Sequence, residues 1–449
     1  MPDLFELDYF SIIDISWALL AIVIFALIVN VRKKKHRDLD YSEYYTVNVW
    51  MKITLSLVYA VYYITVVKGG DTLAYWDGAI KMQNLFFKNP SYYFEELLNP
   101  PDLTMFYKHF DLQTGLPPGW IYREPESWFI SKIMSILSFF SIKSYLVATL
   151  ILAYISSIAS WKLFELVYSY KLHTKRNIAI AVVLIPSVSF WCSGITKDTI
   201  VLFSTIFIIY HAFQILSLDK ETKLKNWLAI ICFGFLLMHI RSFMLATILV
   251  PMAMSYTVRL VNKYRKNKFK FYLIRFSTFI IGILFFILQG NQLANSEQLA
   301  EAALLNKDFA TNTTYEGTRY DIGITDYSAQ GMIQVMPAAI LAGMYRPFPW
   351  EARTLTMIAN GLEDLFFIYL TFQFFRKGFF KKVSMIRKNE FLVFAFFFVI
   401  LMSYMAGVTS GLLGVLVRFK APVIPFLLIL LTVNFQNLES DIKINSELN

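Results

Sequence analysis

Long apolar runs, separated by short polar or basic segments, dominate the pattern of the chain. A helix needs about 20 apolar residues to cross the hydrocarbon core of a membrane. The apolar residues do not alternate with polar ones, as they would in the strands of an outer-membrane barrel. We therefore predict an all-α protein, a polytopic transmembrane helix bundle with about eleven spanning helices. The predicted spans are residues 11–30, 46–67, 143–166, 177–195, 199–216, 225–240, 242–260, 271–290, 355–375, 391–407 and 411–434.

Two long polar segments, residues 68–127 and 291–353, separate these runs, and we expect both to be outer loops with surface helices. Each borders or contains an apolar stretch that is too short to cross a membrane. We expect the first stretch, residues 128–141, to lie at the membrane surface. The second, residues 333–344, is expected to enter the membrane and return. The whole chain, residues 1–449, is predicted to be one integral membrane domain.

Composition agrees with this class and excludes others. The chain is 57% hydrophobic and only 16% charged, whereas an ordinary soluble domain has about 25% charged residues. A soluble globule could not cover so much apolar surface, and a disordered chain would have the opposite composition. Cys192 and Cys232 both lie in apolar runs and show no metal-ligand spacing. We therefore predict neither a disulfide framework nor a zinc site.

The net charge of +10 could indicate a nucleic-acid partner, but its distribution argues against one. The basic residues form short clusters beside the apolar runs, as the positive-inside rule predicts for cytoplasmic loops. The first cluster, residues 32–37, directly follows the first run. We therefore predict an N-terminus outside the membrane and a short cytoplasmic tail, residues 435–449, and no nucleic-acid partner.

Five cations lie instead near the predicted outer ends of helices. A charge at bilayer depth costs about 2.5–3.5 kcal/mol and usually faces a cavity or a partner. One interpretation is that these side chains extend to the surface or form structural ion pairs. If they share a cavity, they would bind an anion such as a lipid-linked phosphate or pyrophosphate. The five are Lys197, Arg241, Arg346, Arg418 and Lys420.

The start of the first outer loop holds a second group of candidate residues. Two glycines permit a tight turn out of the membrane, and Asp71 and Asp77 follow, six residues apart. Two carboxylates could serve as base, as acid, or as ligands of a divalent cation. Tyr75 and Trp76 are suited to stacking on sugar rings. The alternative is a helix cap formed by Asp71 beside an interfacial aromatic belt.

Further acidic candidates in the same loop are Glu124 and Glu126. The sequence contains no nucleotide-binding loop, metalloprotease motif, serine-hydrolase motif or dinucleotide fingerprint. Nucleotide-driven chemistry within this chain is therefore not predicted.

Three short motifs carry a resemblance to a known class. They are the Gly-Gly-Asp-Thr entry to the first outer loop with Tyr75, the Pro-Ser-Val-Ser-Phe-Trp-Cys-Ser-Gly-Ile-Thr-Lys-Asp stretch ending at Asp198, and the Arg-Phe-Lys-Ala-Pro-Val-Ile-Pro-Phe stretch starting at Arg418. Together they resemble bacterial multi-pass polysaccharide polymerases of the O-antigen and exopolysaccharide type, within the wider GT-C class of membrane glycosyltransferases. The resemblance covers most of the membrane core.

The resemblance implies that sugars linked to polyprenyl phosphate are joined at the outer face of the bacterial inner membrane. It implies that the N-terminus is periplasmic and that the partners are a lipid-linked glycan, membrane lipids and envelope-biosynthesis proteins. Because no Asp-x-Asp or Asp-Glu pair occurs, the need for a divalent cofactor stays open. The implied acid or base is Asp71, with Asp77 as an additional candidate. The implied phosphate clamp is Arg241, Arg418 and Lys197, with a contribution from Arg346.

Two other classes are compatible with the same residues. A transporter or flippase of an anionic lipid-linked glycan could use the cations as a transit site. A structural subunit of an envelope secretion or motility machine could use the outer loops to bind a partner. Transporters often contain inverted repeats and midplane sites. This chain shows no obvious repeat, and its unusual charges gather at one leaflet, so the enzyme is favoured.

Overall fold

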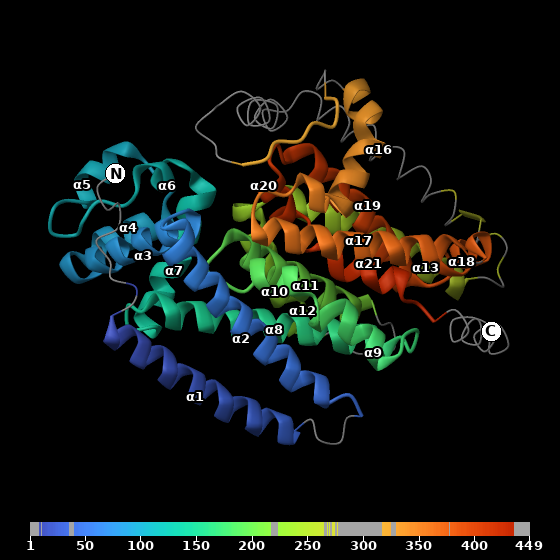
Figure 1. Cartoon of the computed structure of the whole chain (residues 1–449), viewed down its shortest axis with the longest axis horizontal. Helices are drawn as coiled ribbons and strands as arrows, with labels where there is room; N and C mark the ends of the chain where they lie inside the picture. The colour runs from blue at the N-terminus through green and yellow to red at the C-terminus, as the bar shows by residue number, and fades with distance from the viewer. Residues whose placement is uncertain are drawn as a thin grey trace. The chain divides into compact units, whose positions relative to one another are not determined.

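The computed structural model describes residues 9, 11–35, 40–216, 223–264, 267, 269, 272, 273, 276, 317–324, 329–376 and 378–434. These residues form helices and connecting segments, with one isolated β-bridge between Arg319 and Leu412 and no β-strand among them. The prediction of an all-α protein is confirmed. The chain divides into two compact units (Figure 1). The first comprises Met1–Leu166 and Val182–Leu245, and the second Val167–Ala181 and Ala246–Asn449.

Within the described residues, seven helices are long and apolar enough to cross a membrane, or eight if one bent pair is counted as a span. Their composition is that of a membrane protein. The bent pair is α20 (Leu413–Phe419) with α21 (Val423–Leu431), which meet at 67°. The seven are α1 (Ile12–Lys35), α2 (Glu43–Tyr62) continued by η1 (Tyr63–Val67), α8 (Tyr145–Ser169), α11 (Lys197–Leu216), α13 (Phe243–Lys263), α17 (Leu355–Arg376) and α19 (Glu390–Thr409).

Three predicted spans differ from this set. Residues 177–195 do not form one helix, because Pro186 has no backbone N–H to donate and begins a new helix. The span 225–240 is a 17-residue helix, α12 (Leu224–Ile240), and the span 271–290 lies almost entirely outside the described residues. The broken segment consists of α9 (Lys175–Ile178), η2 (Ala179–Val183) and α10 (Pro186–Trp191).

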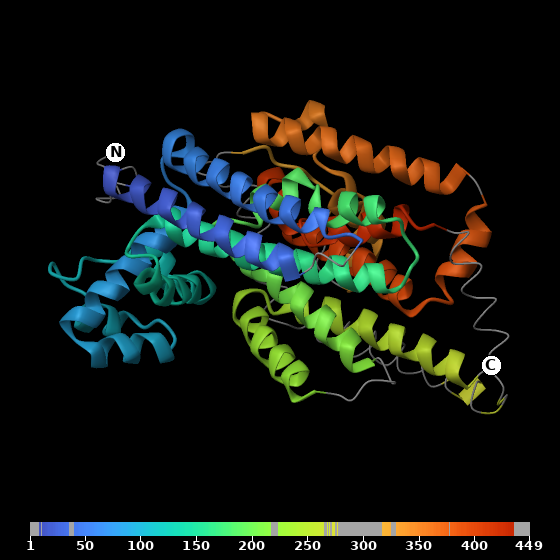
Figure 2. The ribbon, with the colours of Figure 1, turned by 90° about the horizontal axis from the view of Figure 1, so that it is seen from below.

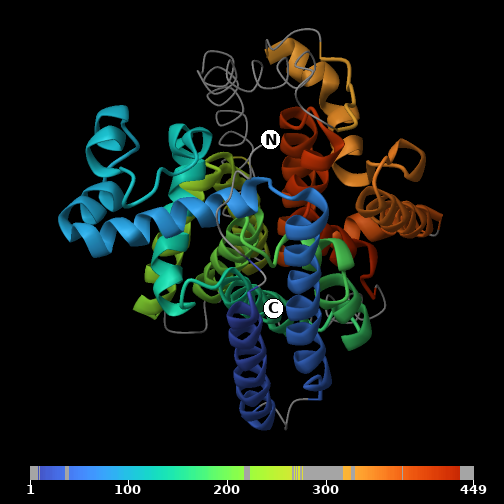
Figure 3. The ribbon, with the colours of Figure 1, turned by 60° about the vertical axis from the view of Figure 1, so that its left-hand side comes forward.

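The first predicted outer loop is mainly helical and forms what we name the α3–α7 subdomain. Its chain leaves η1 through a tight turn, in which Gly70 has a φ of 84° and a Cβ there would lie 3.0 Å from the ring of Tyr63. The glycine turn expected from the sequence is thus confirmed. Figure 3 shows α3 running across the end of α2 instead of continuing its direction. The helices are α3 (Asp71–Lys88), α4 (Pro90–Leu98), α5 (Leu103–His109), α6 (Gly119–Arg123) and α7 (Pro125–Phe140).

Close packing of α3 on α7 holds this subdomain together. Gly78 on α3 lies so near α7 that a Cβ would come within 2.8 Å of the Ser131 hydroxyl. Trp128, at the start of α7, is completely buried. The stretch 128–141, which was expected to lie at the membrane surface, packs along α3, and its strongly exposed apolar residues are Ile136 and Phe140.

The second unit is built around an equally close contact between α16 (Ala329–Tyr345) and α19. A Cβ on Gly343 would lie 2.0 Å from the Ser403 carbonyl oxygen, and one on Gly407 would lie 2.1 Å from that of Ala339. Small residues four apart on both helices let the backbones touch, as is common between membrane helices. The unit also contains η3 (Pro349–Glu351) and α18 (Phe379–Ile386), and Figure 2 shows the chain turning from α17 into α18.

Candidate functional site

The five cations singled out in the sequence are divided between the two units. Lys197 and Arg241 belong to the first unit, and the other three to the second. Each group occupies one set of helix ends within its own unit, and each is described in turn.

In the first unit, the start of α11 faces the end of α12. Thr196 accepts a hydrogen bond from the backbone N–H of Thr199 at 3.0 Å and so caps α11. Asp198 therefore lies in the first turn, where the helix dipole favours a carboxylate. Arg241 follows the last residue of α12, and its Nη2 lies 2.6 Å from Oδ1 of Asp198. Both side chains are buried, with 6% and 0% exposed.

Two carboxylates of the outer loop lie beside this buried pair. Nζ of Lys197 is 3.6 Å from Oε2 of Glu126 and 3.7 Å from Oε2 of Glu124. Lys197 is 15% exposed, whereas the two glutamates are about half to two-thirds exposed. They stand at the beginning of α7, where Pro125 starts the helix. The carboxylates are thus open to solvent, and the lysine lies between them and the interior of the unit.

Contacts between α7 and α12 hold these helix ends together. The ring of Phe129 stacks on His239, with centroids 4.9 Å apart and planes 24° apart, and also packs on Phe235. Three helix ends therefore meet in one place, which we name the α7–α11–α12 site. Its residues are Glu124, Glu126, Lys197, Asp198 and Arg241.

Chemically, this site combines exposed bases with shielded positive charge. Ionised carboxylates at its edge can accept a proton from a hydroxyl. The ammonium group and the guanidinium behind them can stabilise a developing anion, and low exposure strengthens that effect. Sequence reasoning had identified both cations and named both glutamates. It had not anticipated that Lys197 would lie against them.

Asp71 and Asp77, the leading acid–base candidates, both lie on α3. Asp71 is the first residue of the helix, and Asp77 is 5% exposed with its Oδ1 3.6 Å from Nζ of Lys81. Six helical residues separate them by about 9 Å along the axis and about 120° around it. The two carboxylates therefore do not share a face of α3, and a joint site at this position is not formed by the helix.

The two aromatic candidates are packed inside the subdomain. Tyr75 and Trp76 are 2% and 1% exposed, and the ring of Trp76 contacts Tyr145 with centroids 6.2 Å apart. Their packing accounts for their presence. A sugar could reach these rings only if α3 moved. Sugar stacking by Tyr75 and Trp76 remains a prediction.

Among the cations of the second unit that the structure describes, Lys420 is the most deeply buried. Its Nζ contacts both carboxylate oxygens of Asp364 and donates to the carbonyl oxygen of Arg346 at 2.8 Å. Both side chains of the pair are only 1% exposed. Asp364 was not among the sequence candidates. The available signal was an acidic residue inside a predicted span, which usually has a partner in the bundle.

The other two cations lie at helix ends: Arg346 directly follows α16, and Arg418 lies in the last turn of α20. Arg346 donates from Nε to Glu351 at 3.0 and 3.2 Å, and its guanidinium lies 5.1 Å from the ring of Tyr320. Arg418 is half-buried in the last turn of α20. The sequence-based alternative of structural ion pairs thus applies to at least Arg346 and Lys420, and their role as phosphate ligands stays a prediction.

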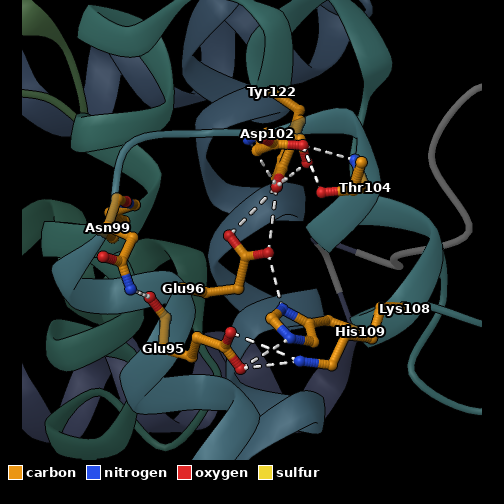
Figure 4. Close-up of polar contacts among 9 residues, drawn as sticks. Glu95, Glu96, Asn99, Asp102, Thr104, Lys108, His109 and Tyr122 are labelled. Atoms are coloured by element: carbon orange, nitrogen blue, oxygen red, sulfur yellow. Dashed lines mark hydrogen bonds and ion pairs between the residues drawn. The ribbon is translucent and has the colours of Figure 1, made fainter.

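A polar cluster in the α3–α7 subdomain was missed from the sequence (Figure 4). His109 lies between two carboxylates, with Nδ1 2.9 Å from Glu96 and Nε2 3.1 Å from Glu95. The Tyr122 hydroxyl donates to Glu96 at 3.0 Å. Burial, together with the charge of Glu96, raises the pKa of Tyr122. These contacts join α4, α5 and α6, and no local sequence pattern connects residues so far apart.

Neither a metal site nor a similarity to a known protein indicates a function for these residues. Among the residues that the structure describes, no group of three or more His, Cys, Asp and Glu side chains could hold a metal ion. Comparison of the chain with protein-family models, curated proteins and solved structures gives no match. Function must therefore be inferred from the residues themselves.

Proposed function

We propose that the chain is a membrane glycosyltransferase of the polysaccharide-polymerase type. It would join sugars linked to polyprenyl phosphate at the outer face of the bacterial inner membrane. The observation that supports this most is the α7–α11–α12 site, where exposed carboxylates of Glu124 and Glu126 face Lys197 at the end of a membrane helix. A base and a shielded cation side by side are what glycosyl transfer from a phosphate requires.

In the proposed reaction, the bond between the anomeric carbon of the donor sugar and the carrier phosphate oxygen breaks. A bond forms from that carbon to an acceptor hydroxyl, whose proton passes to a carboxylate of Glu124 or Glu126. The phosphate leaves with its negative charge, which Lys197 and Arg241 stabilise. Asp198 holds the Arg241 guanidinium in place. Asp71, which lies in the same α3–α7 subdomain as the two glutamates, remains a second candidate base.

The proposed topology has eleven crossings, a periplasmic N-terminus and a cytoplasmic C-terminus. These crossings are the seven long helices, the bent α20–α21 pair counted as one span, α12, the broken α9–α10 segment and residues 271–290. Under this topology, the start of α7, the start of α11 and the end of α12 all fall on the periplasmic side. Their contacts in one unit support that arrangement.

One observation favours a transporter of an anionic lipid-linked glycan as the second candidate. α20 and α21 form an interrupted helix with a 67° bend, and Lys420 beside the break is paired with buried Asp364. Broken helices with buried charges are typical of transport sites. The enzyme is preferred because the α7–α11–α12 site also provides exposed bases, which transport does not need.

The test uses purified full-length protein in liposomes with a polyprenyl-pyrophosphate oligosaccharide, and measures glycan lengthening by gel electrophoresis. Lys197→Ala, and separately the double variant Glu124→Gln/Glu126→Gln, should reduce lengthening by about 10²- to 10³-fold. The matched control, Lys88→Ala, removes a surface lysine of the same loop and should leave it unchanged. Unchanged lengthening in both test variants would refute the assignment, and glycan transfer across the membrane without lengthening would favour the transporter.

A further inference from the structure

Exposed apolar side chains gather at one end of the α3–α7 subdomain. They come from the last turn of α3, from α4, and from the end of α7 with the residues after it. Ring contacts join them: Phe86 lies 5.1 Å from Phe139 and 6.3 Å from Phe94 between centroids. We name this surface the aromatic ledge. Its members and their exposed fractions are Phe87 (67%), Phe94 (51%), Leu98 (80%), Phe140 (74%) and Ile142 (57%).

The chain connections place the ledge close to a membrane surface. Ile142 is three residues before Tyr145, where the spanning helix α8 begins, and α3 begins four residues after η1 ends at Val67. Both ends of the subdomain are therefore tied to the ends of membrane helices. Figure 3 shows α3 leaving the end of α2 sideways.

The link between α7 and α8 is unusual in a way that fits an apolar surrounding. Ile142 and Lys143 both have left-handed backbone conformations, with φ of 55° and 59°. For a β-branched residue this conformation is an outlier. The turn leaves the Ile142 side chain outside the fold, where water would give it no compensating contact. Lipid acyl chains would cover it.

A basic residue beside the aromatic ledge, Lys143, is placed as lysines at a membrane interface are. Nζ of Lys143 lies 5.7 Å from the ring centroid of Phe87 and donates to the side-chain oxygen of Asn84. A lysine at the rim of an aromatic patch can place its stem on apolar surface and its ammonium among lipid phosphates. Exposed apolar patches with a polar rim commonly mark membrane-interaction sites.

We propose that the aromatic ledge inserts into the boundary between headgroups and acyl chains of the leaflet at which η1 ends and α8 begins. The occupant is bilayer lipid, with apolar anchors from three segments and Lys143 at the phosphate level. The ledge then fixes the subdomain against the membrane at a point separate from its two chain connections. This inference does not depend on the reaction proposed above or on which side of the membrane the leaflet faces.

The test places a polarity-sensitive fluorophore on single cysteines of the full-length chain in nanodiscs of phosphatidylethanolamine and phosphatidylglycerol. Cys192 and Cys232 are first replaced by alanine. Phe94→Cys and Leu98→Cys report on the ledge. Tyr107→Cys is the matched control, because Tyr107 is 79% exposed on α5, which Figures 1 and 3 place on the side of α3 away from α8.

The labels at 94 and 98 should emit at shorter wavelength and lose most of their fluorescence when the nanodisc contains lipid doxyl-labelled near the headgroup. The label at 107 should keep its fluorescence. Equal quenching at all three positions, or none at 94 and 98, overturns the proposal. Short-wavelength emission without quenching also overturns it, since a protein surface would then cover the ledge. All three sites are more than half exposed, and size-exclusion chromatography checks that the variants fold.

Discussion

Each unit contains a buried ion pair, and the two pairs differ in what lies around them. Arg241 and Asp198 in the first unit adjoin Lys197, which faces solvent-exposed glutamates. Lys420 and Asp364 in the second unit are both almost completely enclosed, and a backbone carbonyl takes a further hydrogen bond of the lysine. A ligand that binds beside Lys197 could therefore interact with the first pair. The second pair is enclosed in the protein interior.

Physical cost explains the difference. Taking two charges out of water is expensive, and close pairing only roughly offsets it. Removing one partner of an enclosed pair leaves a bare charge with no water to replace the lost contact. The pair in the first unit should be less sensitive, because Lys197 directly precedes Asp198 in the chain and keeps a positive charge near it. The following variants separate the two cases.

The largest expected effect comes from breaking the enclosed pair. Asp364→Leu leaves the Lys420 ammonium buried without its carboxylate, and we expect a loss of about 3–5 kcal/mol in unfolding free energy. The double variant Asp364→Leu/Lys420→Met should recover most of this loss, because both charges are gone. Unfolding of the purified protein by increasing detergent denaturant, followed by circular dichroism, measures both. A single variant as stable as the parent would show that the pair is not enclosed.

A smaller effect is expected for the pair in the first unit. Arg241→Met should lower the unfolding free energy by about 3 kcal/mol, the lower end of the range for a broken buried pair, because Lys197 directly precedes the unpaired Asp198. Glycan lengthening should fall further than stability does, whereas Arg241→Lys keeps the charge and should retain part of both. The same unfolding and lengthening assays apply. If Arg241→Met destabilised as strongly as Asp364→Leu, the contrast between the pairs would not hold.

A pH dependence is expected at a further buried cation, Lys132 on α7, which donates to the carbonyl of Asn99. Burial lowers its pKa from 10.5 to about 8, against the opposing charge of Glu96. Between these values the unfolded chain binds more protons than the folded one, so stability should rise with pH from about 8 to about 10.5. Below about 8 this group should cause no slope.

Denaturant titrations followed by tryptophan fluorescence at pH 7, 8 and 10 measure this slope. Lys132→Met should remove the part that Lys132 contributes, while Lys88→Met, at a partly exposed position on α3, should keep it. An identical slope in Lys132→Met and the parent chain would show that another group is responsible.

Local features followed the sequence closely. The lengths of apolar runs gave the helices α1, α2, α8, α11 and α19, and the paired glycines before Asp71 gave the turn into α3. Predictions from local sequence patterns were wrong where the end of a helix depends on packing against other helices. Pro186 was expected inside one span, but it begins a new helix after a break.

The candidate site was only half visible in the sequence. Lys197 and Arg241 stood out because charge at bilayer depth is costly. The pairing of Lys197 with Glu124 and of Lys420 with Asp364 was not predicted, because nothing in a linear pattern connects residues so far apart. Asp77 was expected beside Asp71, and helical geometry separates them.

By itself, the sequence determined that this chain forms helices long and apolar enough for a membrane, because the thickness of the hydrocarbon core sets a length that can be counted along the chain. It also marked which charges were out of place. Only the tertiary structure decided which carboxylate each cation faces and which apolar side chains stay uncovered. Those contacts join segments that are distant in the sequence. They depend on how the helices pack against one another, and the periodicity of a single helix carries no information about that packing.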